Sequence, residues 1–182
     1  MVKLHDQTLR DAHQSLLATR MRTEHMLPIL EKMDQVGFFS MEVWGGATFD
    51  VPIRFLNEDP WERLKAIKSR VKHTPLQMLE RAMNIVAYSN FPDDVLKEFI
   101  HYARKDGIDN FRIFDALNDR RNLKGPIDAV KSEGAHAQGC VSYTISPVHT
   151  SEFFIELFRD LQKMGCDSIA IKDMSGILTP QA

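Results

Sequence analysis

The sequence predicts an α/β protein in which parallel strands build the N-terminal part of a TIM-type (β/α)8 barrel. Short apolar, β-branched segments alternate with amphipathic helical segments, a pattern typical of βαβ units and of a parallel sheet. Polar residues end the predicted strands, where barrel enzymes place their functional side chains; they are Arg10–Asp11, Glu42, Arg81, Asp115, Thr144 and Lys172–Asp173. An open doubly wound sheet would place a glycine-rich turn after its first strand. The residues at that point, 11–15, contain no glycine.

The first two units are predicted from their strand composition and from helix-capping residues. We expect Val2–Leu9 and Ser40–Trp44 to be strands, the second followed by a glycine-rich loop at residues 45–48. A helix is predicted over Thr23–Gln35, with Thr23 as its N-cap. A second helix should end at Arg70 and begin at Asp59 or Pro60, because aspartate caps helices and proline suits their first position.

Four further units follow with the same alternation. The predicted strands are Pro75–Leu79, Asn110–Phe114, Ala137–Thr144 and Ser168–Lys172. The predicted helices are Pro92–Gly107, Asn122–Ser132 and Ser151–Met164.

A complete barrel needs eight units and about 250 residues, whereas these 182 residues supply six strands. We therefore expect residues 1–182 to be one partial barrel domain, without strands seven and eight and without any biotin-carrier domain. An open piece of this kind would expose two sheet edges and an apolar inner face.

The composition is that of a globular domain, with 43% hydrophobic and 26% charged residues. A net charge of −2 and the lack of a basic run argue against nucleic acid as a partner. No apolar run is long enough to cross a membrane, so no direct membrane insertion is expected. The N-terminal residues lack a signal-like apolar stretch and the chain has only two cysteines, Cys140 and Cys166. These features predict a cytoplasmic protein with reduced thiols.

Three strand ends carry residues suited to chemistry, each with a structural alternative. Asp11 can bind a divalent cation and its neighbour Arg10 can hold an oxyanion, or the two can simply pair across a loop. Lys172 ends a buried strand, where a lone ammonium is costly; it must be paired, deprotonated or chemically converted. Arg81 suits bidentate recognition of a carboxylate, or it pairs with Glu42 or Asp50.

Several long strings resemble one family: LRDAHQSLLATRMRTE, EVWGGATFDV, RFLNEDPWERL, TPLQML, FRIFDALND, SYTISPVHT and GCDSIAIKDMSGILTP. They resemble the biotin-dependent carboxyltransferase domain shared by pyruvate carboxylase, the oxaloacetate decarboxylase α subunit and the large-barrel subunit of transcarboxylase. The resemblance implies a (β/α)8 barrel that binds a divalent metal (zinc, manganese or cobalt). It implies pyruvate or oxaloacetate as substrate, a biotinylated carrier domain or subunit as partner, and a homodimer as the assembly.

The resemblance also implies roles for particular residues. Asp11 and Lys172, the latter carbamylated, would bind the metal. The residues implied to hold pyruvate or to lie near the biotin are Arg10, Gln14, Arg81, Asp50 and Tyr88, with Arg10, Gln14 and Lys172 as catalytic groups. Two histidine ligands on a seventh strand, and a threonine used for proton transfer, have no counterpart in this chain. The isolated chain is therefore expected to be inactive.

One residue departs from the family pattern. Glu80 stands before Arg81 where the family has leucine. Alternation along the strand directs Glu80 away from Arg81, toward the helices, where an unpartnered acid is costly; alternatively it bends back to pair with an arginine.

The leading hypothesis is carboxyl transfer between carboxybiotin and pyruvate or oxaloacetate, with the metal and Arg10 stabilising an enolate. One alternative is a metal-dependent aldolase-type lyase or acyl-CoA condensing enzyme on a related barrel. Another is an inactive fragment, or half of a split barrel.

Overall fold

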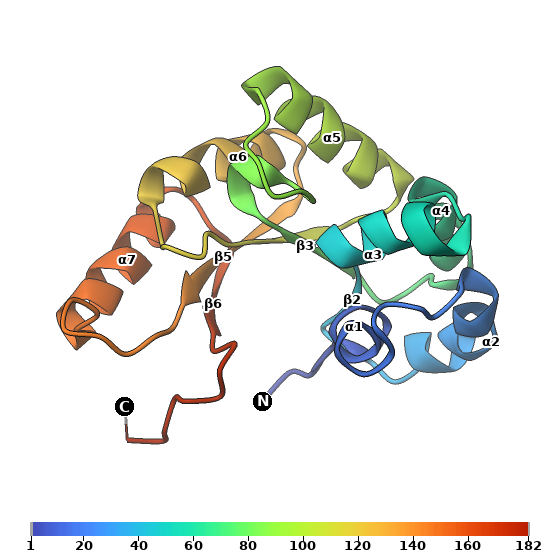
Figure 1. The fold of residues 1–182 in the computed structure, drawn as a ribbon, viewed down its shortest axis with the longest axis horizontal. Coiled ribbons are helices and arrows are strands. Elements are labelled where there is room, and N and C mark those ends of the chain that lie inside the picture. Colours follow the sequence, from blue (N-terminus) through green and yellow to red (C-terminus); the bar gives the residue numbers. More distant parts are fainter. Residues whose placement is uncertain (1, 182) are drawn as a thin grey trace.

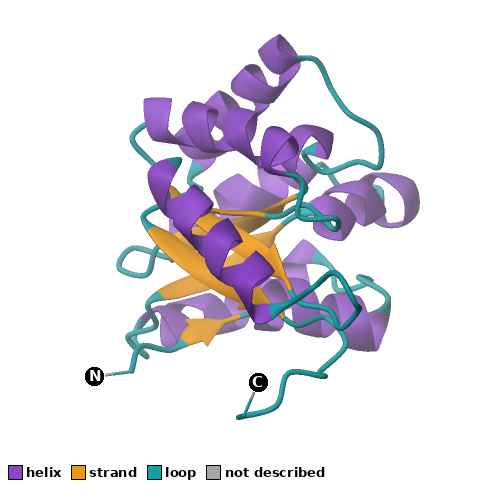
Figure 2. Cartoon of the chain, turned by 90° about the vertical axis from the view of Figure 1, so that its left-hand side faces the viewer, coloured by secondary structure: helices purple, strands orange, loops and turns teal. Residues whose placement is uncertain are grey.

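Six parallel strands, in the order β1-β2-β3-β4-β5-β6, curl into a half-barrel with helices along its outer side. The computed structural model describes residues 2–181. Figure 1 shows the helices as an arc around the strands, open on the side where the two termini lie. Figure 2, turned by 90°, shows helices packed across the strands. The strands are β1 (His5–Asp6), β2 (Ser40–Trp44), β3 (Leu76–Glu80), β4 (Asn110–Ile113), β5 (His136–Ser142) and β6 (Ser168–Lys172).

The helices precede or follow each strand as expected of repeated βα units. They are α1 (His13–Leu17), α2 (Thr23–Asp34), α3 (Gly46–Val51), α4 (Pro60–Arg70), α5 (Asp93–Asp106), α6 (Arg120–Ser132) and α7 (Ser151–Lys163). Shorter helical turns are η1 (Thr8–Ala12), η2 (Pro52–Leu56) and η3 (Ala82–Asn84). The fold class predicted from the sequence is confirmed.

The inner face of the sheet is polar, so the expectation of an apolar inner face was wrong. Successive strand residues point to opposite faces, and the inward set includes Glu42, Gln77, Arg112 and Gln138, which are linked by hydrogen bonds or ion pairs. Ser168 on β6 continues the chain of contacts from Gln138. The inner face therefore resembles the floor of a binding site rather than a hydrophobic core.

The hydrophobic core lies between the outer face of the sheet and the helices. Its buried strand residues include Met41, Met78, Phe111, Ile113 and Val141, and its helical partners include Leu64, Ile67, Leu96, Ile100, Leu123, Ile127, Leu157 and Leu161. A bulge in β2 pairs Trp44 with Met78 and thereby directs the indole to this outer layer. There the Trp44 ring lies 4.9 Å from that of Trp61 and 5.7 Å from that of Phe99.

The first strand is much shorter than the predicted Val2–Leu9. Only His5–Asp6 pairs with β2, because the carbonyl of Gln7 accepts hydrogen bonds from the N–H groups of Arg10, Asp11 and Ala12. These bonds wind the chain into the π-helical turn η1. As a result Arg10 and Asp11 leave the strand on a compact turn.

Two further local predictions were wrong. Residues 45–48 do not form a loop, because the helix α3 begins at Gly46. The N–H of Phe49 donates to the Gly45 carbonyl at 2.9 Å and stabilises the first turn of this helix. Thr23 is the first residue of α2 rather than its N-cap. The backbone N–H and the hydroxyl of Thr23 both donate to Glu58 Oε2, at 3.2 and 2.6 Å respectively. A side chain distant in sequence therefore caps this helix.

The remaining boundaries agree with the prediction to within two residues. Asp59 caps α4 by accepting from the Trp61 N–H at 2.8 Å, and Pro60 holds the first position, as predicted. The strand Ser168–Lys172 is confirmed at both ends. Two boundaries differ by two residues: β5 ends at Ser142 instead of Thr144, and α6 begins at Arg120 instead of Asn122 because Asp119 caps it.

Asp34, at the end of α2, is a buried carboxylate with a structural task. It accepts hydrogen bonds from the backbone N–H groups of Lys72, His73 and Thr74, the closest at 2.7 Å. Burial opposes its ionisation, but these bonds hold the pKa of Asp34 below its ordinary value. Asp34 thus fixes the segment that leads into β3.

Glu80 ends β3 on the outer face, fully buried, and neither of its oxygens has a hydrogen-bond partner among the described residues. Burial raises the pKa of Glu80 to about 8. Of the two orientations considered from the sequence, the structure shows the one toward the helix layer.

Candidate functional site

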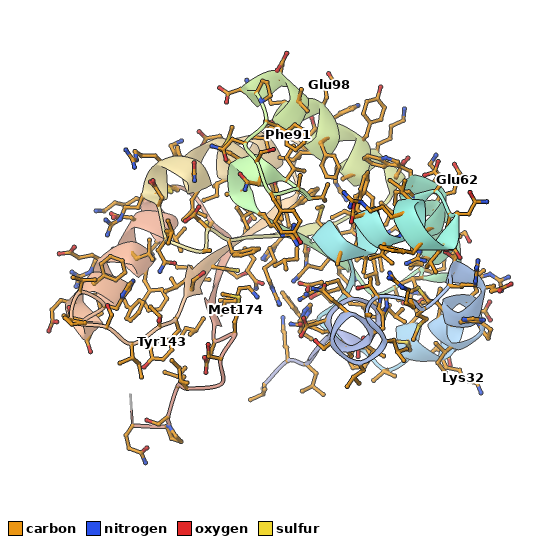
Figure 3. The ribbon with its side chains drawn as sticks, in the orientation of Figure 1. Lys32, Glu62, Phe91, Glu98, Tyr143 and Met174 are labelled. Atoms are coloured by element: carbon orange, nitrogen blue, oxygen red, sulfur yellow. The ribbon has the colours of Figure 1, made fainter. Side chains whose placement is uncertain are left out.

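A cavity of about 600 Å³ lies at the carboxyl ends of the strands, on the inner side of the half-barrel. Its lining is Gln7, Arg10, Asp11, Gln14, Ser15, Gly46, Leu79, Arg81, Arg112, Phe114, Cys140 and residues 170–174. Figure 3 labels Met174 on this inner side, whereas Lys32, Glu62 and Glu98 lie on the outer rim of the molecule. The cavity therefore brings together five of the seven residues proposed from the sequence: Arg10, Asp11, Gln14, Arg81 and Lys172.

Arg10 is buried and almost fully engaged by its neighbours. Its Nε donates to Glu42 Oε1 at 2.6 Å and its Nη1 donates to Asp11 Oδ1 at 2.8 Å. The third nitrogen, Nη2, lies 2.5 Å from Glu42 Oε1 and 3.3 Å from Gln7 Oε1. These contacts hold the guanidinium in one orientation at the edge of the cavity.

Arg81 is held by a loop that directly follows β3. Its Nη1 donates to the carbonyls of Val86 and Ala87 at 3.2 and 3.1 Å, and its Cζ lies 4.4 Å from the centre of the Tyr88 ring. No carboxylate among residues 2–181 forms an ion pair with Arg81, so neither Glu42 nor Asp50 is its partner. The group can therefore bind an external anion.

The Arg81 loop contains a strained backbone position. Ile85 has φ of 55° and is buried, a conformation that is unfavourable for a β-branched residue. The N–H of Arg81 donates to the Ile85 carbonyl at 2.8 Å and so closes the loop. Strain of this kind gathers at binding sites, where the surrounding contacts enforce one geometry.

Lys172 lies at the end of β6 with its Nζ 5.2 Å from the Phe114 ring centre. Burial lowers the pKa of Lys172, and the positive charge of Arg10 lowers it further. Within residues 2–181 no carboxylate lies within ion-pair distance, 4.0 Å, of this nitrogen. The structural alternative, a salt bridge to Asp173, is therefore not what this structure shows.

The donors for a metal are few. Asp11 and Lys172 line the same cavity, and the Asp11 side chain is half exposed. Within the described part of the chain, however, no group of three or more histidine, cysteine, aspartate or glutamate side chains could hold a metal ion. The two side chains present fit an oxygen-rich site in part only, with Lys172 requiring conversion to an oxygen donor.

Asp50 and Tyr88 do not line the cavity. Asp50 lies on α3 and pairs with Arg54 one turn later, at 2.7 Å. Tyr88 is 85% exposed and lines a separate hollow that shares Arg81 with the cavity. Asp115 and Thr144 also lie outside the cavity; Asp115 accepts from the Leu117 and Asp119 N–H groups and serves its own loop.

The sequence-based selection missed Arg112, which is the fourth cation of the cavity. Its Nη1 lies 3.2 Å from Glu42 Oε2 and its Nε donates to Gln138 Oε1 at 2.8 Å. A signal was present: Glu42, Gln77, Arg112 and Gln138 are polar residues in the middle of four consecutive strands. Cys140 was also missed as a lining residue; burial raises the pKa of its thiol to about 12, so the thiol stays protonated.

Fold and site together define a parallel βα half-barrel with a cavity at the carboxyl ends of its strands that is lined by four cationic side chains, Arg10, Arg81, Arg112 and Lys172. No family model matches the sequence. The chain is 63% identical over 180 residues to a pyruvate carboxylase subunit of Methanocaldococcus jannaschii, covering 99% of this chain and 32% of that protein. It is 51% identical to the methylmalonyl-CoA carboxyltransferase 5S subunit of Propionibacterium freudenreichii subsp. shermanii, covering 95% and 34% respectively.

Solved structures give the same result. The carboxyl transferase domain of Rhizobium etli pyruvate carboxylase, solved with pyruvate and biocytin, superposes with a TM-score of 0.95 at 44% identity. The match covers 100% of this chain and 32% of that one. The chain is thus homologous to the carboxyltransferase domains of pyruvate carboxylases and spans about a third of the length of these relatives. Among its described residues, no helix is both long and apolar enough to cross a bilayer.

Proposed function

We propose that this chain contributes the pyruvate-binding part of a biotin-dependent carboxyltransferase site. The observation that carries the proposal is the grouping of Arg81, Arg10 and Lys172 in one cavity at three strand ends, with Arg81 unpaired by any carboxylate of residues 2–181. Relatives named for pyruvate carboxylation, and a solved relative with pyruvate and biocytin, support it.

In this proposal Arg81 and Arg10 bind different groups of the substrate. Arg81 holds the carboxylate of pyruvate, because its guanidinium lines the cavity and its Nη1 is already anchored on backbone carbonyls. Arg10 and Gln14 face the oxygen of the 2-oxo group, where negative charge grows as the enolate forms. Asp50 and Tyr88 would act only at the entrance, near the incoming biotin.

In the proposed reaction the C–N bond of carboxybiotin breaks and the carboxyl group leaves as carbon dioxide. The biotin nitrogen, which keeps the electron pair of that bond, takes up the proton that the methyl group of pyruvate loses. The resulting enolate carbon attacks carbon dioxide and forms the C–C bond of oxaloacetate. Reversal decarboxylates oxaloacetate. The biotin would be carried by another domain or subunit, and the direction depends on those partners.

Asp11 and a carbamylated Lys172 would hold a divalent metal, which would supply electrostatic stabilisation for the enolate. For carbamylation the Lys172 ammonium first loses one proton, and the resulting amine then forms an N–C bond with carbon dioxide and releases a second proton; a cation thereby becomes an anionic oxygen donor. The further ligands would be additional to the ligating side chains of residues 2–181, which form no group of three or more suited to a metal ion. A homodimer and a cytoplasmic location stay predictions.

The full-length protein tests the proposal directly. We expect carboxylation of pyruvate that requires a biotinylated carrier, and loss of oxaloacetate decarboxylation when the carrier is omitted. Aldol cleavage or acyl-CoA condensation without a carrier would instead favour the alternative enzyme class. The isolated 182-residue chain is expected to show no turnover with metal and free biotin, and robust turnover would contradict this.

Metal affinity should depend on bicarbonate. After chelation and removal of dissolved carbon dioxide, we expect the full-length protein to bind Zn²⁺, Mn²⁺ or Co²⁺ at least about tenfold more weakly, because the carbamate oxygen of Lys172 is then absent. Addition of bicarbonate should restore the affinity in calorimetric titrations. Lys172→Met should bind the metal equally weakly with and without bicarbonate, and a bicarbonate effect that survives in this variant would contradict the carbamate.

Gly46→Ala should impair binding of pyruvate without unfolding the protein. A Cβ at this position would lie 2.5 Å from Arg81 Cζ, so the guanidinium must move away, and a displacement near 1 Å can cost about a hundredfold in rate. We expect kcat/KM for pyruvate to fall at least about tenfold. Ala47→Gly, one residue later, adds no atom and is the control. Equal kinetics in Gly46→Ala and the wild type would show that the position of Arg81 does not matter.

A further inference from the structure

The inner face of the half-barrel contains a buried carboxylate, Glu42, that does not line the cavity. Glu42 was predicted among the residues that end a strand, but it lies in the middle of β2 and is fully buried. Its Oε1 accepts from Arg10 at 2.6 Å, and its Oε2 accepts from Gln77 Nε2 at 2.8 Å and pairs with Arg112 Nη1 at 3.2 Å. One carboxylate therefore joins side chains from the β1 end, β3 and β4.

The contacts continue across the sheet beyond Arg112. The Arg112 Nε donates to Gln138 on β5 at 2.8 Å, and Gln138 Nε2 donates to the Ser168 hydroxyl on β6 at 3.1 Å. The hydroxyl of Ser168 also lies 2.7 Å from His136 Nε2. Side chains on β2, β3, β4, β5 and β6 are thus connected to one another and, through Glu42, to Arg10.

We propose that Glu42 is a positioning residue: it orients Arg10 for the substrate, and Arg112 holds Glu42 in place for this task. The inference rests on the proposed function, in which Arg10 contacts the substrate oxygens. Glu42 itself does not line the cavity, whereas Arg10 and Arg112 do. Its effect on substrate must therefore pass through the guanidinium groups.

The geometry gives Glu42→Gln a specific consequence. A glutamine can keep one acceptor oxygen, but its NH2 group must then face the donors Gln77 Nε2 and Arg112 Nη1. The ion pair with Arg112 is lost, and the bond to Gln77 survives only if the Gln77 amide turns over and gives up its bond from the Ser40 hydroxyl, so the side chain that orients Arg10 is no longer fixed. At the same time the cavity gains one net positive charge.

The added positive charge and the lost orientation of Arg10 predict opposite changes in the affinity for an anion. If charge alone mattered, a more positive cavity would bind a small dianion more tightly. If Glu42 positions Arg10, the anion is bound more weakly despite the added charge, because a misoriented guanidinium cannot form its hydrogen bonds to the anion. Oxalate, a planar dianion similar in size to the pyruvate enolate, is a suitable probe.

The experiment measures oxalate affinity by calorimetry, and kcat and KM for pyruvate, in the full-length protein. We expect Glu42→Gln to weaken oxalate binding at least fivefold and to lower kcat more than it raises KM. Glu42→Asp, which keeps the charge but not the reach, should behave in the same way. Tighter or unchanged oxalate binding in a folded Glu42→Gln protein would overturn the proposal.

Two further variants separate positioning from general damage. Asp34→Asn removes another buried, multiply bonded acid far from the cavity, and should lower the melting temperature without weakening oxalate binding. If Glu42→Gln fails to fold, Arg112→Lys replaces it: a lysine cannot reach both Glu42 and Gln138, and we expect oxalate affinity to fall at least threefold. Wild-type oxalate affinity in Arg112→Lys would overturn the proposal. Absence of carboxyl transfer by the wild type would instead refute the proposed function.

Discussion

Glu80→Leu is expected to raise the free energy of unfolding by about 3 kcal/mol at pH 7, and by about 1 kcal/mol or less at pH 5. Burial raises the pKa of Glu80 to about 8 from an ordinary value of 4.5, so the folded state favours the protonated carboxyl. The wild type therefore has its full stability below about pH 4.5 and loses stability progressively as the pH rises from there to about 8, the pKa of Glu80 in the folded protein. Each unit of the pKa difference corresponds to about 1.4 kcal/mol.

Urea unfolding of the wild type and Glu80→Leu between pH 5 and pH 8 measures this difference. Glu98→Leu is the control, because Glu98 is exposed on α5 and should change stability little at either pH. If Glu80→Leu raised the free energy of unfolding by the same amount at pH 5 and at pH 8, the carboxyl would not titrate between these values, which would contradict the prediction.

Arg81→Lys is expected to lower kcat/KM for pyruvate about a hundredfold or more. Removing one partner of a desolvated, hydrogen-bonded charge pair costs about 2–5 kcal/mol, and each 1.36 kcal/mol is a factor of about ten in rate. Lysine keeps the positive charge but cannot bind a carboxylate with two parallel N–H groups. It would also lose at least one of the bonds to Val86 and Ala87 that orient the side chain.

The loss should fall mainly on KM if Arg81 binds the substrate carboxylate, which is present throughout the reaction. Arg54→Lys is the matched control, since Arg54 is an exposed arginine paired with Asp50 outside the cavity. A KM within twofold of the wild type in Arg81→Lys would remove Arg81 from the substrate site.

The elements that the sequence predicted well are those with a local signal. The helix α4 begins where Asp59 caps it and where the ring of Pro60 fixes a helical φ angle. Both effects act within one turn of the helix. The strand Ser168–Lys172 is a short apolar run before a polar end. The cavity residues at β1, β3 and β6 could be proposed because the ends of parallel strands meet at one edge of a sheet.

What could not be predicted depends on contacts between distant segments. The N-terminal cap of α2 comes from Glu58, thirty-five positions after Thr23, and no local pattern indicates it. The π-helical turn η1 shortens the first strand because one carbonyl, that of Gln7, collects three N–H donors. Asp50 was carried into the site by resemblance alone, and its ion pair with Arg54 is set by the helical spacing of α3 and η2. Arg112 joins the site through an ion pair with Glu42 that spans from β4 across β3 to β2, a contact between residues far apart in the sequence.

The polar inner face also shapes how such a protein can change over evolutionary time. Glu42, Gln77, Arg112 and Gln138 satisfy one another's donors and acceptors, so a substitution at one position leaves its neighbours unmatched. Tolerance to mutation at these positions should be strongly epistatic: paired replacements that restore a donor to each acceptor are accepted where either single change is not. New substrate preferences are then reached more readily through the loop after β3, which contacts the Arg81 side chain with two backbone carbonyls and the exposed Tyr88 ring, than through the strands beneath it.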